Sequence, residues 1–214
     1  MHTELGVDPA RHRARPWRVH GLASDFMLRD VWRVPVIAAG GDRFEDFYRL
    51  VAENGIATDG AVANALFALR ERLGRWFRWD DHKHELPIPG CTERSVRERL
   101  TTEDLARDRS AEVALPHQRL ADFRPVYLFA DESLSEISNS TIHALAHFGW
   151  VDDGAGKKTA EMAVYTKSRG LLSDVYMGAI KPFRHRFVYR ALIRRLVRLW
   201  NERPRPEQAA TSGS

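Results

Sequence analysis

The 214-residue chain has the length of one domain, and 43% of its residues are hydrophobic, which is enough for a buried core. Together with a charged fraction of 29%, this composition excludes an intrinsically disordered chain. The sequence holds no run of 18 apolar residues and no hydrophobic signal core near its beginning, so we expect neither a membrane-spanning helix nor secretion. A lone cysteine, Cys91, cannot form an internal disulfide, so we expect a cytoplasmic location.

The net charge of +4 comes mainly from arginine, much of it after Lys181. A basic surface is typical of proteins that meet nucleic acid, anionic lipid or an acidic partner. Charge runs more often only keep a surface solvated, and the last helix must also supply an apolar stripe. We therefore rank nucleic-acid binding last among the functions considered below.

Residues 1–16 are polar, and we interpret them as a flexible arm. The following segment contains a strand at Phe26–Val34, because apolar residues alternate there with arginines. Asp30 interrupts this pattern, since it places a carboxylate on the same face as Trp32.

Helical patterns occupy the next part of the chain. Asp42 is a suitable cap for a short helix that ends at Asn54, before Gly55. Apolar residues at spacings of three and four predict a longer helix from about Gly60 to Trp79. Short helical turns are expected at Glu93–Leu100 and Thr102–Arg107.

From Phe123 onwards the period changes to two, which predicts strands. The expected strands are Val126–Ala130, Ile142–Trp150 and Thr159–Lys167, the last two joined by a Gly-containing turn that suits antiparallel neighbours. On the middle strand, Phe148 shares one face with other apolar residues, whereas His143 and His147 share the opposite face.

A long amphipathic helix follows, beginning after Ser173 or Asp174, and Pro182 should kink it. Pro204 should end it, and residues 204–214 are expected to be a disordered tail. Residues 17–203 would then form one domain. The element order predicts the α+β class, with an antiparallel sheet curved around the C-terminal helix and two or more helices after the first strand.

Several phrases of the sequence resemble a bacterial family, domain of unknown function 2867. Besides the opening around Asp25–Trp32 and the helix at Leu66–Trp79, they lie in the last part of the chain. These later phrases are Ser138–Ala144, His147–Val151, Glu161–Tyr165, Gly170–Leu172, Tyr176–Met177 and Lys181–His185.

The family is similar to helix-grip proteins, also called the START or Bet v 1-like (SRPBCC) superfamily. This resemblance implies a cavity between the sheet and the last helix that holds a lipid, steroid, polyketide or hormone. It implies no particular reaction, because members include carriers as well as cyclases and dehydratases, and no shared catalytic motif is present.

Four residues are candidates for acid–base chemistry in such a cavity. Asp30 would be desolvated on an apolar face, which favours a raised pKa, although a salt bridge is the commoner explanation of such a residue. His143 would act alone, since about 13 Å separates it from His147 along the strand; an outer, hydrogen-bonded position for both is the simpler interpretation. Tyr165 and His185 complete the set.

Aromatic and apolar residues from the strands and the last helix are the candidate ligand contacts, with one arginine at the cavity mouth to meet a carboxylate or phosphate. These residues are Trp32, Tyr127, Phe148, Tyr176, Ile180, Phe183 and Arg184. We predict no metal and no cofactor, because His82, His84, Glu85 and Cys91 lack a second pair of ligands and no nucleotide-binding fingerprint occurs.

The first functional hypothesis is a carrier or binding protein for a hydrophobic small molecule. The second is an enzyme that uses the same cavity for cyclisation or dehydration, for example in natural-product biosynthesis. The third is an interaction protein that meets nucleic acid through the arginine-rich last helix. The sequence leaves open whether a reaction is catalysed, which ligand is bound and whether an exposed apolar patch makes a dimer.

Overall fold

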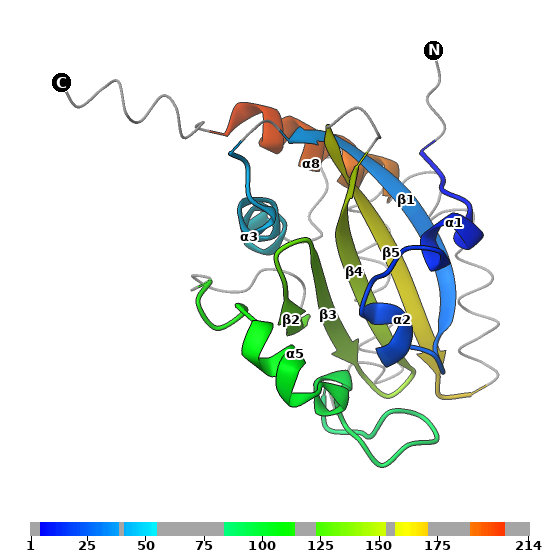
Figure 1. Cartoon of the computed structure of the whole chain (residues 1–214). Coiled ribbons are helices and arrows are strands. Elements are labelled where there is room, and N and C mark those ends of the chain that lie inside the picture. Colours follow the sequence, from blue (N-terminus) through cyan, green and yellow to red (C-terminus); the bar gives the residue numbers. More distant parts are fainter. Residues whose placement is uncertain are drawn as a thin grey trace.

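The computed structural model describes residues 5–38, 41–54, 84–113, 123–152, 157–170 and 189–203. Five strands form one antiparallel sheet in the order β1-β5-β4-β3-β2. The strands are β1 Met27–Ala38, β2 Arg124–Leu128, β3 Glu132–Ser138, β4 Ile142–Asp152 and β5 Lys158–Ser168. With a C-terminal helix beside the sheet, the α+β class is confirmed (Figure 1).

The described helices lie before, between and after the strands. They are α1 Pro9–Arg13, α2 Val19–Leu22, α3 Phe44–Asn54, the 3-10 helix η1 Val96–Arg99, α5 Thr102–Arg107 and α8 Tyr189–Glu202. Helices α3 and α5 confirm the sequence prediction, and Thr101 caps α5 in a reciprocal capping box with Asp104. The helix expected at Gly60–Trp79 and the first part of the last helix lie outside the described residues, so the helix-grip assignment stays a prediction.

Helices α3 and α8 pack on one face of the sheet, which we call the helix face. Its core is aromatic: Trp32 and Phe148 from the strands meet Phe47 of α3 and Trp200 of α8. The Trp200 ring lies 5.8 Å from both Phe47 and Trp150, and its Nε1–H donates to the Ile37 carbonyl at 3.0 Å. Because edge-to-face rings fill space densely, this cluster fixes α8 on the sheet.

The opposite face, which we call the cover face, lies under the N-terminal segment with α1 and α2 and under the segment around η1 (Figure 1). Trp17 packs there directly against β4. An added Cβ at Gly149 would lie 2.7 Å from the Trp17 ring, so only glycine admits the indole at this point.

Residues 5–16, which the sequence led us to interpret as part of a flexible arm, pack against the sheet. Strand β1 is an edge strand, so one side of its backbone can pair with the N-terminal segment. The Val7 N–H donates to the Val31 carbonyl at 3.0 Å, and the Arg33 N–H donates to the Leu5 carbonyl at 2.7 Å. Asp8 then caps α1, with Pro9 at its first position. The packed arm carries His12, which is fully buried.

Strand β3 was missed in the sequence because its residues are largely polar. Ser133 and Ser135 point to the helix face, whereas Glu132 and Glu136 point to the cover face, and all four are buried. A period-two search for apolar residues does not find this strand, because serines occupy positions on one face and glutamates flank Leu134 on the other.

Replacing Trp200 with alanine should reduce the free energy of unfolding by about 3–5 kcal/mol, because the indole is fully buried and leaves a cavity. Chemical denaturation measures this. Leu105→Ala is the control: the side chain is 48% exposed, so its effect should stay within about 0.5 kcal/mol. Equal losses in the two variants would contradict the packing of α8 described above.

Candidate functional site

Ionisable side chains line the cover face of the sheet in a pattern set by strand register. Because β3, β4 and β5 are antiparallel neighbours, alternate residues of each strand meet on the same face. The residues concerned are Glu132 and Glu136 on β3, His143 and His147 on β4, and Glu161 and Tyr165 on β5. All are buried, so each carboxylate requires hydrogen-bonding partners.

Glu136 joins the segment around η1 to the sheet. Its carboxylate accepts hydrogen bonds from His143 Nε2 at 2.9 Å, from the Val96 N–H at 2.9 Å and from the Ser95 hydroxyl. Burial opposes ionisation of Glu136, but these hydrogen bonds outweigh it, so its pKa lies below the ordinary value.

Glu132 joins the N-terminal segment to the sheet in the same way. It accepts from His147 Nε2 at 3.1 Å, from the Tyr127 hydroxyl at 2.7 Å and from the Arg18 N–H at 2.8 Å. Burial again opposes ionisation, and the donors again outweigh it and lower the pKa of Glu132. Burial also lowers the pKa of His147, so this imidazole is neutral and its Nε2 carries the donated hydrogen.

The third carboxylate, Glu161, begins a longer chain of hydrogen bonds. Its Oε1 lies 2.6 Å from His12 Nδ1, and His12 Nε2 lies 2.6 Å from the Tyr165 hydroxyl. The hydroxyl lies 3.3 Å from His20 Nδ1, and His20 Nε2 is 3.1 Å from the backbone oxygen of His12. His20 is half-buried, so the chain connects a buried carboxylate with a partly exposed imidazole.

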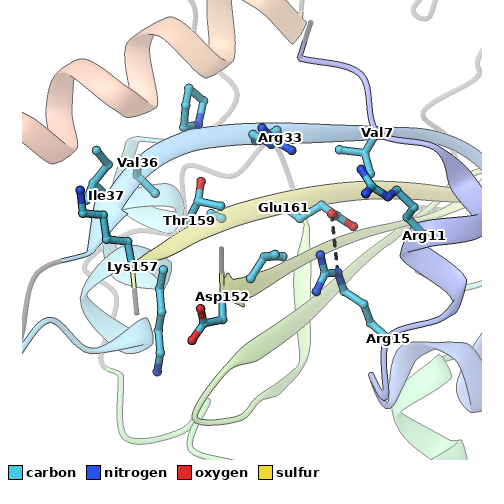
Figure 2. A pocket seen from close by; sticks show the side chains of 14 residues that line it. Val7, Arg11, Arg15, Arg33, Val36, Ile37, Asp152, Lys157, Thr159 and Glu161 are labelled. Atoms are coloured by element: carbon cyan, nitrogen blue, oxygen red, sulfur yellow. Dashed lines mark ion pairs between the residues drawn. The ribbon is translucent and has the colours of Figure 1, made fainter. Parts of the chain in front are cut away.

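Glu161 also lines a pocket of about 530 Å³ between the N-terminal segment and the ends of β1, β4 and β5. Figure 2 shows Arg11 and Arg15 on one side of Glu161, and Lys157 and Asp152 at the far end. The lining residues are Val7, Arg11, Arg15, Arg33, Pro35, Val36, Ile37, Val151, Asp152, Lys157, Lys158, Thr159, Ala160 and Glu161.

The charge of this pocket is positive, since five cationic side chains face two carboxylates. The Arg15 Nε is 3.9 Å from Glu161 Oε2, which is too long for a hydrogen bond, and it has no hydrogen-bond partner among the described residues. Arg11 and Arg33 are exposed at the rim. The pocket therefore has the chemistry to receive an anion.

The structure separates the site residues predicted from the sequence. Asp30, Trp32 and Phe148 lie on the helix face, where buried Asp30 accepts from the Tyr189 hydroxyl at 3.1 Å. Tyr127 and Tyr165 lie on the cover face with His143. They cannot line one cavity with the first three, because the sheet lies between them.

The remaining sequence candidates, Tyr176, Ile180, Phe183, Arg184 and His185, lie outside the described residues. The sequence candidates on the cover face, such as Tyr165, have neighbours that the sequence did not suggest as site residues. These neighbours are His12, Arg15, Arg33 and Glu161. One signal could have revealed part of this set: Asp8-Pro9 is a helix start, which argues against a loose arm.

The side chains of the described part of the chain contain no group of three or more His, Cys, Asp or Glu that could hold a metal ion. His84, Glu85 and Cys91 belong to that part, whereas His82 does not. Among the described helices, none is long and apolar enough to cross a membrane.

The fold and the site define an α+β domain with a buried ionisable layer and a basic pocket on one face of its sheet. The chain belongs to the family described as "Protein of unknown function (DUF2867)", whose model matches residues 22–191. No curated protein and no solved structure was found to match the chain. The match includes Arg33, Glu132 and Glu161 but begins after Arg11, His12 and Arg15, so the N-terminal side of the pocket lies outside it.

Acidification should destabilise the cover face in two steps. The pKa values of His20 and His147 are lowered in the fold, so their contribution to stability is present above the ordinary value of 6.5 and is lost as the pH falls below it. The pKa values of Glu132 and Glu136 are also lowered, so a second contribution is lost below 4.5. Denaturation at a series of pH values measures both steps.

His147→Gln provides the matched comparison, because a glutamine amide can donate to Glu132 but does not titrate. The slope of stability against pH just below pH 6.5 should decrease by up to about 1.4 kcal/mol per pH unit, the effect of one proton. An unchanged slope would contradict the assignment of His147 as a neutral buried imidazole.

Proposed function

We propose that this protein binds a small amphipathic acid, a carboxylate or phosphate on an apolar body, in the basic pocket of the cover face. The observation that carries the proposal is the convergence of Arg11, Arg15 and Arg33 on one pocket with apolar walls. The ligand class keeps the lipid or polyketide-like character expected from the helix-grip resemblance and adds an anionic group.

The lining supports both halves of such a ligand. Val7, Ile37 and Val151 offer apolar surface, whose burial favours an apolar body by about 25 cal/mol per Å². The guanidinium groups suit a carboxylate or phosphate, because their planar arrangement of N–H donors matches two oxygens at once. Pockets that fix orientation by a few polar groups on apolar walls are typical of small-molecule sites.

The position of the pocket differs from the cavity expected between the sheet and the C-terminal helix. The described part of the helix face is filled by packed aromatic rings, including Phe47, Trp150 and Trp200. A ligand of the proposed class therefore finds its matching charges on the cover face.

An enzyme acting on the same ligand is the second candidate, favoured because Glu161 lines the pocket and contacts His12. A carboxylate–imidazole pair beside a bound acid is suited to proton transfer, as cyclisation or dehydration would require. Mass spectrometry of a metabolite extract incubated with the wild type or with Glu161→Gln tests this. A metabolite consumed only by the wild type is the expected result, and identical extracts would exclude the reaction.

The binding proposal predicts discrimination between two dyes of the same shape. 8-Anilinonaphthalene-1-sulfonate carries a sulfonate that N-phenyl-1-naphthylamine lacks. Arg33→Gln should weaken binding of the sulfonate dye by about ten- to a hundredfold, since a charge-assisted hydrogen bond contributes roughly 1.5–3 kcal/mol. It should leave binding of the neutral dye nearly unchanged. Fluorescence titration measures both affinities.

Arg124→Gln is the matched control, because Arg124 is an exposed arginine on β2, at the opposite edge of the sheet from β1. It should not change either affinity. Equal weakening by Arg33→Gln and Arg124→Gln would show only a general effect of net charge. No binding of the sulfonate dye to the wild type would overturn the proposal itself.

A further inference from the structure

The basic pocket of the cover face has charged residues at each of its two ends. At the first end, Arg33 of β1 lies opposite Glu161 of β5 in the strand register. Figure 2 shows Arg11 and Arg15 beside the same carboxylate. Three guanidinium groups therefore face one carboxylate, and this end of the pocket keeps an excess of positive charge.

The second end of the pocket lies where β5 begins. Lys157 and Lys158 line it together with Asp152, which is the register partner of Lys158 on β4. All three residues are exposed, and Figure 2 places Lys157 and Asp152 at the far end from the arginines. Two ammonium groups facing one carboxylate again leave an excess of positive charge.

The lining residues between the two ends are uncharged. They include Pro35 of β1, Val151 of β4 and Thr159 of β5. Thr159 is the register partner of Val151, and its hydroxyl donates to the Val34 carbonyl at 2.9 Å. Because that hydroxyl is engaged within the sheet, the side chains of this middle stretch suit hydrocarbon better than a polar group.

Strand geometry gives the separation of the two charged ends. Four residue steps lead from Glu161 to Lys157, which correspond to about 13 Å between their Cα atoms in extended chain. On β1 the same number of steps leads from Arg33 to Ile37, whose exposed side chain lies at the far end. Arginine and lysine side chains are long and can lean inward, so the two ends suit anionic groups roughly 8–13 Å apart.

We propose that the ligand of this pocket carries two anionic groups, one at each end of an apolar chain. A dicarboxylate with about seven methylene groups between its carboxyl groups has the required length, since an extended chain advances about 1.2 Å per bond. This inference rests on the proposed function and makes its ligand class narrower. The arginines bind the first anionic group, the middle stretch covers the chain, and the lysines bind the second anionic group.

The lysines favour a second anionic group over an uncharged ligand end. A ligand of this length with a single carboxylate at the arginines would direct its uncharged end toward Lys157 and Lys158 and would remove water from their ammonium groups. Removing water from a charge without supplying a partner is unfavourable. A second carboxylate at this position replaces the water with opposite charge, so the same contact becomes attractive.

Chain length distinguishes a pocket with two charged ends from a protein that is merely basic. The net charge of +4 attracts every dianion, whatever its length. The carboxyl groups of butanedioate lie only about 4 Å apart, so this ion cannot reach both ends of the pocket at once. An advantage that requires both ends therefore appears in the longer dianion alone.

The test is displacement of 8-anilinonaphthalene-1-sulfonate from the wild type, followed by fluorescence at about pH 7, where carboxylic acids are ionised. Nonanedioate is compared with its monomethyl ester, which has nearly the same length and one charge fewer, and butanedioate is compared with its own monomethyl ester. We expect nonanedioate to displace the dye at a concentration about five- to tenfold lower than its ester, the effect of one partly exposed ion pair. Butanedioate should show no such advantage.

Variants assign the advantage to the far end of the pocket. In Lys157→Gln/Lys158→Gln, the advantage of nonanedioate over its ester should fall below about twofold. Arg124→Gln/Arg194→Gln is the matched control, because it removes the same charge from two exposed arginines that do not line the pocket. It should keep the advantage of the wild type.

Equal displacement of the dye by nonanedioate and its ester in the wild type would overturn the inference while leaving the proposed function intact. The lysines would then serve only to keep this end of the sheet solvated. An advantage that butanedioate shares, or that survives replacement of both lysines, would also overturn the inference. If the lysine variant does not fold, the comparison of the two chain lengths in the wild type still decides the matter. Absence of dye binding, or a bound dye that none of these acids displaces, would instead refute the proposed function.

Discussion

The interaction on which the rest of this structure depends is the pairing of buried carboxylates on the cover face. Glu132, Glu136 and Glu161 are each nearly inaccessible to water, and an ionised carboxylate is stable there only if hydrogen-bond donors or positive charge surround it. The sheet supplies some donors, His143 and His147, but the others come from segments that pack over it. The buried carboxylates therefore require the N-terminal segment and the segment around η1 to pack over this face of the sheet.

This requirement explains why a short polar segment is ordered. Helix α1 has five residues and could not persist alone, because helices of this length are unstable in water. It is held by the pairing of the chain before it with β1, by the His12–Glu161 contact, and by Trp17 where β4 has Gly149. Apolar burial and charge pairing therefore act on the same few residues. As a result, Arg11 of α1 and Arg15, which follows the C-cap of α1, lie at fixed positions beside Glu161.

The sequence predicted the parts of this arrangement that depend on local pattern. Alternation around Phe148 identified β4 and placed its histidines on the face opposite Phe148, and cap chemistry identified α5. It could not show that the second face is also covered, because burial of His143 depends on Glu136, which belongs to a strand without apolar alternation. Nor could it show the register shift between Leu28 and Asp30, which leaves Asp30 on the helix face opposite Val164.

The two sides of the pocket have different origins in the chain, and this bears on the proposed ligand site. The sheet side, with Arg33 and Glu161, lies within the residues that the family model matches, whereas the side with Arg11, His12 and Arg15 precedes them. Glu161 is the point of contact between the two sides, since it meets His12 and Arg15 across the interface. Through these two contacts the carboxylate holds the N-terminal segment against the sheet. Under the proposed function, an acid that enters the pocket would compete with this carboxylate for Arg15, so the contacts that order the N-terminal segment are also the ones that such a ligand would disturb.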